Sequence, residues 1–171
     1  GVSITVKNVT VSLAGGVAFV LPVGTLNVSN SIIVAGTAYN PGANVTVTAN
    51  YNLYQVTVFS ALAPSLAAWR SLSSGDAASF TGDPLFVNPA GNDYHEQSTT
   101  GSWDPGTQSF VPRAAQSPAI DRGSPADPAG NEPATNGGLI NLGAYGGTAE
   151  ASKSPAQFIL TTRPAGGDAV F

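Results

Sequence analysis

Cysteine and methionine are absent from the 171-residue sequence, and charged residues are scarce. Without cysteine there is no disulfide, thiolate metal site or cysteine nucleophile, and without methionine there is no methionine-ligated haem. Charged residues make up 9% of the chain, against roughly 25% in an ordinary soluble domain. The net charge of −4 argues against nucleic acid and anionic membranes as partners, because both attract basic surfaces.

Long hydrophobic runs are also missing. A helix that spans a membrane needs roughly 20 apolar residues, and the longest candidate, residues 15–23, is interrupted by Pro22. No signal peptide is recognisable. Both ends fall in strand-like stretches, and low charge with abundant Asn, Thr, Ser and Gly is common in exported β-rich surface proteins. We therefore expect a piece of a longer extracellular or cell-surface protein.

Residues that form turns are plentiful. The chain contains 20 glycines and 13 prolines, which predicts many tight turns and few long helices. Apolar residues still account for 42% of the chain, enough for a sizeable core. These proportions favour an all-β fold.

Residues 1–59 repeat a short strand motif. Asn8, Asn27 and Asn44 each begin a run of β-branched and polar residues, at nearly regular intervals. A repeat of about 20 residues with one strand and a glycine-containing turn is typical of a solenoid, whose rungs bury their inner faces against one another. The expected inner face consists of Val9, Val11, Val28, Ile33, Val45 and Val47.

An antiparallel sandwich with short hairpins is the alternative fold, because its turns would be spaced similarly. The asparagine at the start of each repeat favours the solenoid. Asparagine tolerates left-handed corners, and its amide can hydrogen-bond between rungs.

Residues 60–75 have a helical periodicity instead. Leu62, Leu66, Trp69 and Leu72 are spaced by four, three and three residues. This spacing predicts one helix of about ten residues, with Trp69 packed on the solenoid.

The remaining sequence is mostly irregular. Residues 76–155, which we call the closing segment, are dense in Pro, Gly, Asp and Asn, with short strand-like stretches at 84–87, 108–111 and 139–142. A β pattern resumes in residues 156–171, which we interpret as a linker or the first strand of a following module.

Four motifs follow one another in the closing segment: DPLFV at 83–87, GNDYH at 91–95, SPAIDRG at 117–123 and NGGLINLGAYGGT at 136–148. In this order they resemble right-handed parallel β-helix proteins, large exported bacterial proteins of the pectate-lyase-like superfamily. Upstream, NSII at 30–33 and YNLY at 51–54, followed by Trp69 and by Gly75-Asp76, look like the late rungs of that family. The resemblance covers roughly residues 20–153.

The resemblance implies the C-terminal rungs and closing segment of a β-helix. Rungs would occupy residues 1–59, and residues 60–155 would form one short helix and an irregular Pro/Gly-rich closing segment. Further rungs would precede residue 1, so the open first rung would be covered by the rest of a longer chain or by self-association. The family's catalytic groups lie on earlier rungs, so the resemblance implies no catalytic residue here.

No catalytic constellation stands out from the residues themselves. His95 is the only histidine, and the chain has no Gly-x-Ser-x-Gly turn that would present a nucleophile. Asp83, Asp104 and Asp127 each precede proline, where a carboxylate commonly accepts the N–H groups of a turn. The six basic residues form no cluster that would serve a lyase.

Calcium is the one cofactor that the sequence supports. Residues 89–93 and 128–132 share the pattern Pro-Ala-Gly-Asn-acid, and Ca²⁺ takes six to eight hard oxygen ligands. The candidate ligands are Asn92, Asp93, Asp127, Asn131 and Glu132. The alternative is that these acids accept N–H groups in Pro/Gly turns, since neither loop matches a known calcium motif.

Aromatic residues provide a candidate sugar-binding surface. Tyr54, Trp69 and Trp103 could stack on the faces of sugar rings, as aromatic side chains commonly do. The alternative is that these rings belong to the core.

The sequence therefore favours a non-catalytic structural module, such as a rigid stalk or a matrix or filament component. One alternative is the C-terminal part of a polysaccharide lyase or glycoside hydrolase with its active site upstream. Another is a carbohydrate-binding or adhesion module with a polysaccharide as its partner.

Overall fold

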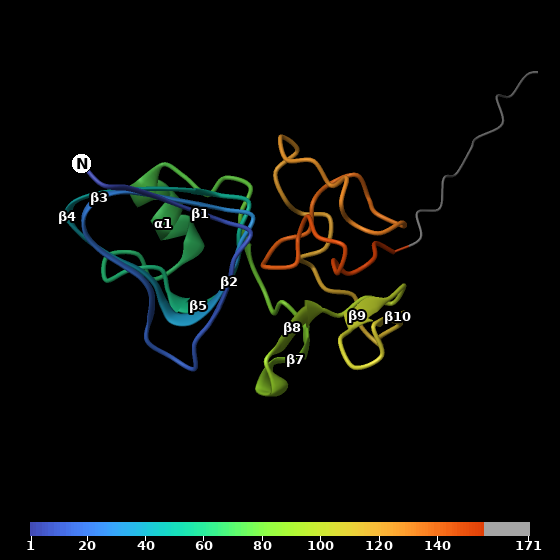
Figure 1. The fold of residues 1–171 in the computed structure, drawn as a ribbon. Helices are drawn as coiled ribbons and strands as arrows, with labels where there is room; N and C mark the ends of the chain where they lie inside the picture. Colours follow the sequence, from blue (N-terminus) through green and yellow to red (C-terminus); the bar gives the residue numbers. More distant parts are fainter. Residues whose placement is uncertain (156–171) are drawn as a thin grey trace, which may run out of the picture.

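The computed structural model describes residues 1–155, where strands dominate (Figure 1). The first half contains β1 (Ser3–Lys7), β2 (Thr10–Ser12), β3 (Val17–Ser29), β4 (Ile32–Asn50), β5 (Leu53–Val58), helix α1 (Leu66–Ser73) and β6 (Phe80–Thr81). The second half contains β7 (Phe86–Asn88), the 3-10 helix η1 (Pro89–Gly91), β8 (Asp93–Glu96), β9 (Ser102–Asp104) and β10 (Ser109–Val111). The all-β class is confirmed, whereas the strand expected in residues 156–171 lies outside the described residues.

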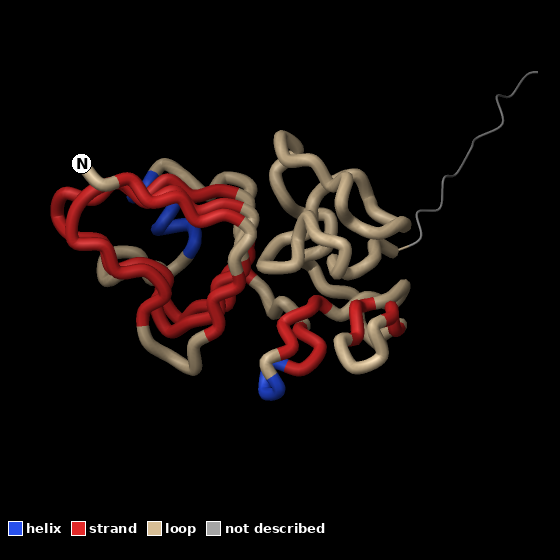
Figure 2. Tube along the Cα trace, viewed as in Figure 1, coloured by secondary structure: helices blue, strands red, loops and turns tan. Residues whose placement is uncertain are grey.

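A six-stranded parallel sheet organises the first half. Its strand order is β1-β3-β4-β5-β6, and β2 also pairs with β4. Ser3 lies beside Thr25, Thr25 beside Thr46, and Ile32 beside Leu53, so equivalent positions recur at a nearly constant interval along the chain. We call each such stretch a rung. Figure 2 shows the rungs following one bent path, and their parallel pairing excludes the antiparallel sandwich.

The repeat has a different register from the one expected. Asn27 pairs with Thr5 and Thr48, and Asn44 pairs with Val23, so neither is equivalent to Asn8. Asn8 instead corresponds to Asn30 on the next rung, because its N–H donates to the carbonyl of Ser29, the residue before Asn30. The left-handed corner lies at the second asparagine of the NVSN motif at 27–30, which the motif spacing could not distinguish from the first.

The rungs enclose the main apolar core. Of the six expected inner residues, Val28, Ile33 and Val47 are buried, and Val9, Val11 and Val45 are half-buried. Aromatic rings stack across this core: Phe19 on Tyr39 at 5.5 Å between centroids, and Tyr39 on Trp69 at 4.8 Å. Such stacked pairs add to the hydrophobic gain from burial.

Helix α1 supplies the last ring of this stack. Its N-cap is Ser65, whose Oγ accepts from the N–H of Ala68 at 3.3 Å, and its C-cap is Ser74 in a left-handed conformation. Trp69 packs on the rungs as expected, but Leu62 and Leu72 are exposed to 80% and 54%. Leu62 precedes the helix, so the helical pattern overestimated its length and its apolar face.

A second apolar cluster joins the rungs to the closing segment. Ile32 and Leu53 point away from the main core and pack with Phe86, Ala119 and Leu142. Ile33, the neighbour of Ile32, belongs to the main core. Since successive side chains of a strand point to opposite faces, β4 is buried on both faces here.

The closing segment contains two small antiparallel pairs. β7 pairs with β8, and β10 pairs with β9, which confirms two of the three short strands expected there. Residues 139–142 form no strand, although Ile140 and Leu142 are buried. Their backbone is held by single hydrogen bonds, such as the one from the N–H of Leu142 to the carbonyl of Ala119 at 3.0 Å.

β1 and β6 are the edge strands of the sheet. β1 pairs only with β3, and Val2 and Ile4 beside this edge are 58% and 40% exposed. At the other end, α1 and the closing segment follow β5 (Figure 1). Neither helix in residues 1–155 has the length and apolar character to cross a membrane.

Candidate functional site

The corner asparagines connect the rungs to the closing segment. Asn30 is buried and has a φ of 50°, and its Nδ2 donates to Asp127 Oδ2 at 2.7 Å and to Asn8 Oδ1 at 3.3 Å. Its Oδ1 accepts from the N–H of Ser124 at 2.8 Å. Asn8 Nδ2 reaches the carbonyl of Gly146 at 2.7 Å. These bonds hold residues 124–146 against the rungs, and we call this contact the seam.

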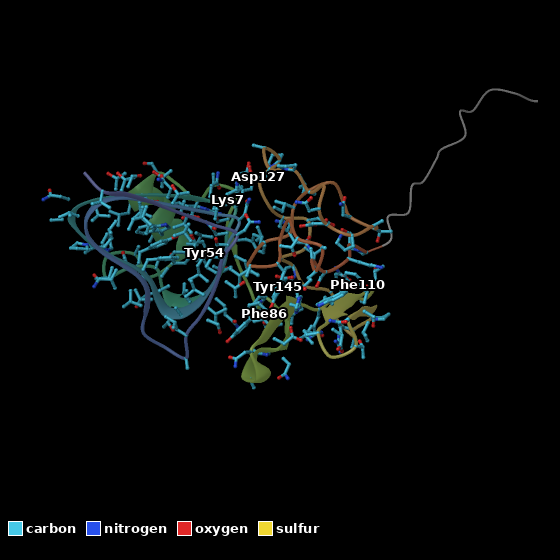
Figure 3. All side chains as sticks on the ribbon, viewed as in Figure 1. Lys7, Tyr54, Phe86, Phe110, Asp127 and Tyr145 are labelled. Atoms are coloured by element: carbon cyan, nitrogen blue, oxygen red, sulfur yellow. The ribbon has the colours of Figure 1, made fainter. Side chains whose placement is uncertain are left out.

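An ion pair lies at the exposed end of the seam. Lys7 donates to Asp127, and Figure 3 shows the two side chains meeting between the first rungs and the closing segment. The hydrogen bonds from Lys7 and Asn30 hold the pKa of the Asp127 carboxyl below its ordinary value. Asp127 therefore holds the closing segment against the rungs.

A buried carboxylate organises the polar centre of the rungs. Asp76 is fully buried and accepts from Trp69 Nε1 at 2.8 Å, Tyr54 OH at 2.9 Å and Ser79 Oγ at 2.5 Å. Tyr54 OH also lies 2.7 Å from Tyr39 OH. Burial raises the pKa of both phenols well above the usual range, so both hydroxyls keep their protons. Every oxygen of Asp76 has donors, which suits a structural role.

The single histidine is buried in the closing segment. His95 Nδ1 lies 2.6 Å from Asp93 Oδ1, and its ring stacks on Tyr145 with centroids 3.5 Å apart. Its Nε2 is 3.6 Å from Glu150 Oε2 and has no hydrogen-bond partner among residues 1–155. An Asp–His pair without a hydroxyl on the second ring nitrogen lacks the nucleophile of a catalytic triad.

The strongest anomaly of the closing segment is Glu96, the last residue of β8. Its side chain is fully buried, and neither carboxyl oxygen has a hydrogen-bond partner in the described part of the chain. Burial raises the pKa of Glu96 to about 8, and the charges of Glu132 and Asp93 add to the rise. Sequence inspection did not single out Glu96, because nothing in its neighbourhood predicts that it is buried.

Glu132 is the second buried acid of this region. Its Oε1 accepts from the N–H groups of Asn141 at 2.7 Å and Gly147 at 2.8 Å, but its Oε2 is buried without a partner in the described residues. Burial raises the pKa of Glu132, although the two N–H donors oppose the rise. Glu132 thus fastens the turn 141–147 while one oxygen stays available.

The five expected calcium ligands do not converge as predicted. Asp127 binds Lys7 and Asn30, and Asp93 binds His95. Asn92 is the left-handed cap of η1, and Asn131 is exposed. Within residues 1–155, no three His, Asp or Glu side chains are placed to hold a metal ion together. Asp93 and Glu132 accept backbone N–H groups, as the alternative interpretation expected, whereas Asp127 accepts from side chains of the rungs.

Two of the three expected sugar-stacking rings are in the core. Trp69 is 2% exposed, and Tyr54, which Figure 3 shows inside the rungs, is fully buried, so neither presents a face to solvent, which corrects that expectation. Both rings lie on inward faces, where Trp69 stacks on Tyr39 and Tyr54 meets Phe59 edge to face. Trp103 is half-buried and meets Phe110 edge to face at 5.2 Å between centroids.

A shallow groove lies where the Tyr51 corner meets the closing segment. It has a volume of about 560 Å³ and is lined by Tyr51, Phe80, Arg122 and Leu139, among others. The Arg122 guanidinium lies 4.7 Å from the centroid of the Phe80 ring. The groove thus combines the cation of Arg122 and the acid Asp121 with two aromatic rings.

Comparison with known proteins identifies no relative. No family model matches the sequence, and no curated protein or solved structure matches it either. The resemblance of residues 20–153 to parallel β-helix proteins therefore depends on the motifs quoted above and enters the functional argument as a proposal.

Proposed function

We propose that this chain is a non-catalytic structural module of a larger extracellular or cell-surface protein. It would form the last rungs and closing segment of a right-handed parallel β-helix of the pectate-lyase-like type. The observation that carries the proposal is the stack of parallel rungs, together with the outer edge of β1, with which no strand of residues 1–155 pairs.

The polar groups support a role in rigidity. Asp76 binds the indole of Trp69 and the phenol of Tyr54, and Asn30 and Asp127 fasten the closing segment. These groups are used for internal contacts, so they are not free to act on a substrate. A module of this kind transmits force and resists proteases, because buried hydrogen bonds and apolar contacts must break together before the chain opens.

The open edge of β1 indicates where the module connects. An unpaired strand edge offers a row of N–H and C=O groups for pairing with another strand. Val2, Ile4, Val20 and Val23 are exposed on the first rungs, and a further rung would cover apolar groups of this kind. We propose that this rung belongs to the rest of a longer chain or to a second copy.

The natural polypeptide tests this proposal directly. An antibody against residues 1–155 is used to recover the protein from the medium, the cell surface and the cell interior of cells that produce it naturally, and its intact mass and peptide map are measured. A surface or secreted polypeptide far heavier than the present chain, with β-helix sequence upstream, is expected. A free intracellular polypeptide with the mass of the present chain alone would contradict the proposal.

Polysaccharide binding is the second candidate function, favoured by the groove beside Tyr51. Arg122 over Phe80 would bind a carboxylated sugar, with the Tyr51 ring against a sugar face. Retention on immobilised alginate, with none on dextran and loss in an Arg122→Ala variant, is the expected result. Equal retention of the variant and the unchanged chain would exclude the groove.

A further inference from the structure

Glu96 lacks the partner that a buried carboxyl group needs. Both of its oxygens are unpaired in the described structure, and so is Oε2 of Glu132. An unpaired buried polar group costs on the order of 1–3 kcal/mol, and more if it is charged. In native structures such groups usually meet an ordered water or an ion.

The charges nearby are negative. Glu96 and Glu132 both lie against the turn 141–147, which contains Gly143. Burial is the main cause of the raised pKa values of Glu96 and Tyr145, and acidic neighbours add to both: Glu132 and Asp93 for Glu96, and Asp93, Glu150 and Glu96 for Tyr145. His95 lies beside Glu96 in sequence, but its Nδ1 is held by Asp93. The region therefore concentrates acidic groups around Tyr145.

The basic side chains of residues 1–155 are engaged elsewhere. Lys7 binds Asp127, and Arg113 binds Asp104. Arg70 donates to backbone carbonyls of residues 76–79, whereas Arg122 and Lys153 lie over aromatic rings. No Lys or Arg in the described chain forms an ion pair with Glu96 or Glu132.

We propose that Glu96 binds a Ca²⁺ ion between the closing segment and the first rungs, with the free oxygen of Glu132 as a second acidic ligand. The site differs from the two loops that the sequence suggested, because its principal ligand is the buried end of β8. Calcium accepts neutral oxygens beside carboxylates, so two acids are sufficient when hydroxyl, carbonyl or water oxygens complete the shell.

Gly143 lies against both a carboxyl oxygen of Glu96 and a neutral oxygen of the rungs. A Cβ atom at Gly143 would lie 3.2 Å from Glu96 Oε1 and 2.8 Å from Thr10 Oγ1, so both oxygens flank the backbone of Gly143. Gly143 has a φ of 85°, and the absence of a side chain lets this backbone approach both groups. The ion would thereby connect β2 of the rungs to β8 of the closing segment.

Calcium fits these oxygens better than magnesium. Magnesium requires near-ideal octahedral geometry and keeps several waters, whereas calcium adapts to irregular sets of six to eight oxygens. Carboxyl oxygens that are buried leave little room for a hydrated magnesium ion. An extracellular module commonly binds calcium with a dissociation constant of about 10⁻⁴–10⁻³ M, which is the affinity we expect.

Calorimetric titration of the EDTA-treated full chain with Ca²⁺ and with Mg²⁺ tests this site. One ion per chain is expected for Ca²⁺, with a rise in melting temperature and at least about a tenfold preference over Mg²⁺. Glu96→Gln should weaken Ca²⁺ binding at least about tenfold, because the amide keeps one oxygen and loses the charge. Asp104→Asn is the matched control, since Asp104 lies on the β9–β10 pair beside Arg113 and should bind unchanged.

A second variant keeps the test valid if Glu96→Gln does not fold. Thr10→Val retains the shape of the side chain but removes the hydroxyl that lies against Gly143 and accepts from the N–H of Ala144 at 3.0 Å, and we expect about a threefold weaker affinity. The proposal is overturned if the unchanged chain shows neither heat nor a thermal shift up to about 10 mM Ca²⁺, ten times the weakest expected dissociation constant. It is also overturned if both variants bind as tightly as the unchanged chain.

Discussion

Asp76 illustrates how one side chain can organise a core. Its carboxylate gathers the indole of Trp69, the phenol of Tyr54 and the hydroxyl of Ser79 inside the rungs. Charge-assisted hydrogen bonds of this kind are about twice as strong as neutral ones. Replacing the carboxylate leaves donors that are buried and can no longer all be satisfied.

Asp76→Asn should therefore lower the free energy of unfolding by about 3 kcal/mol, the loss expected when a buried charged acceptor is removed. Asparagine is the appropriate replacement because Asp76 has a φ of 59°, which asparagine tolerates. Urea unfolding followed by tryptophan fluorescence measures the change. Asp83→Asn, at an exposed turn, is the control, and equal stability of the two variants would refute the role of Asp76.

Glu96 should make stability depend on pH when EDTA keeps the chain free of divalent ions. The folded chain holds the Glu96 proton up to about pH 8, whereas the ordinary value is 4.5, so folding takes up a proton between these values. The contribution of Glu96 to the free energy of unfolding is fully present below pH 4.5. It is lost as the pH rises toward 8, at about 1.4 kcal/mol per pH unit. Urea midpoints measured from pH 5 to about 9 follow the loss.

Glu96→Gln should flatten this pH profile and make the chain more stable than the unchanged protein near pH 8, because the amide never ionises. Glu150→Gln changes an exposed acid nearby and should preserve the slope. Parallel profiles for Glu96→Gln and the unchanged chain would show that another group causes the pH dependence.

Asp76 and Glu96 are also the residues whose burial could not be predicted from the sequence. The strand and helix patterns located Trp69, Val28 and Val47 in the core, because periodic burial leaves a periodic signal. Asp76 and Glu96 lie in turns or at a strand end without such a period. Their burial follows from residues far away in the chain, such as Gly143 beside Glu96, so local sequence carried no signal.

At the scale of elements, the seam joins two structures that otherwise share one apolar cluster. Asn30 contributes to it with two side-chain hydrogen bonds, to Asp127 and from the N–H of Ser124, and with a left-handed corner. Asn30→Gly keeps the corner favourable but deletes the amide, so it should destabilise the chain by about 2 kcal/mol. The Ser124 N–H should then exchange with solvent faster, which hydrogen exchange detects.

Asn27→Ala provides the matched control for Asn30. Asn27 lies in the same motif, but it makes only a long contact to Ser3 Oγ at 3.5 Å. We expect a small effect on stability and none on exchange at Ser124. Equal effects of the two substitutions would contradict both the observed register and the importance of the seam.

The register shows why elements are easier to predict than their alignment. The motif spacing indicated a repeat of about 20 residues and a parallel stack, and the sheet agrees with both. The alignment depended on whether Asn27 or Asn30 occupies the corner, and both placements satisfy the same local pattern. Contact with residues 124–127, far away in the sequence, distinguishes the two.

At the scale of the whole molecule, β1 is the longer of the two edge strands of the sheet, with five residues against two in β6. Proteins commonly protect an edge strand with lysine, proline or a bulge. β1 carries Lys7 near its end, but Lys7 is engaged with Asp127. Val2 and Ile4 are exposed at this edge, so pairing of β1 with another strand would bury apolar surface.

This edge predicts self-association of the 171-residue chain. Pairing of two β1 edges would bury Ile4 and its neighbours, so sedimentation should show a concentration-dependent increase in mass. Ile4→Lys places a charge at the edge and should shift the association to at least about tenfold higher concentration, because each unpaired buried charge costs more than the roughly 1.4 kcal/mol that a tenfold change represents. Leu62→Lys, an equally apolar exposed site beyond β5, should associate like the unchanged chain. If the unchanged chain is monomeric at all concentrations, or if Leu62→Lys has the same effect as Ile4→Lys, the β1 edge does not bind a second copy, and only a covalently continuous rung would complete the sheet.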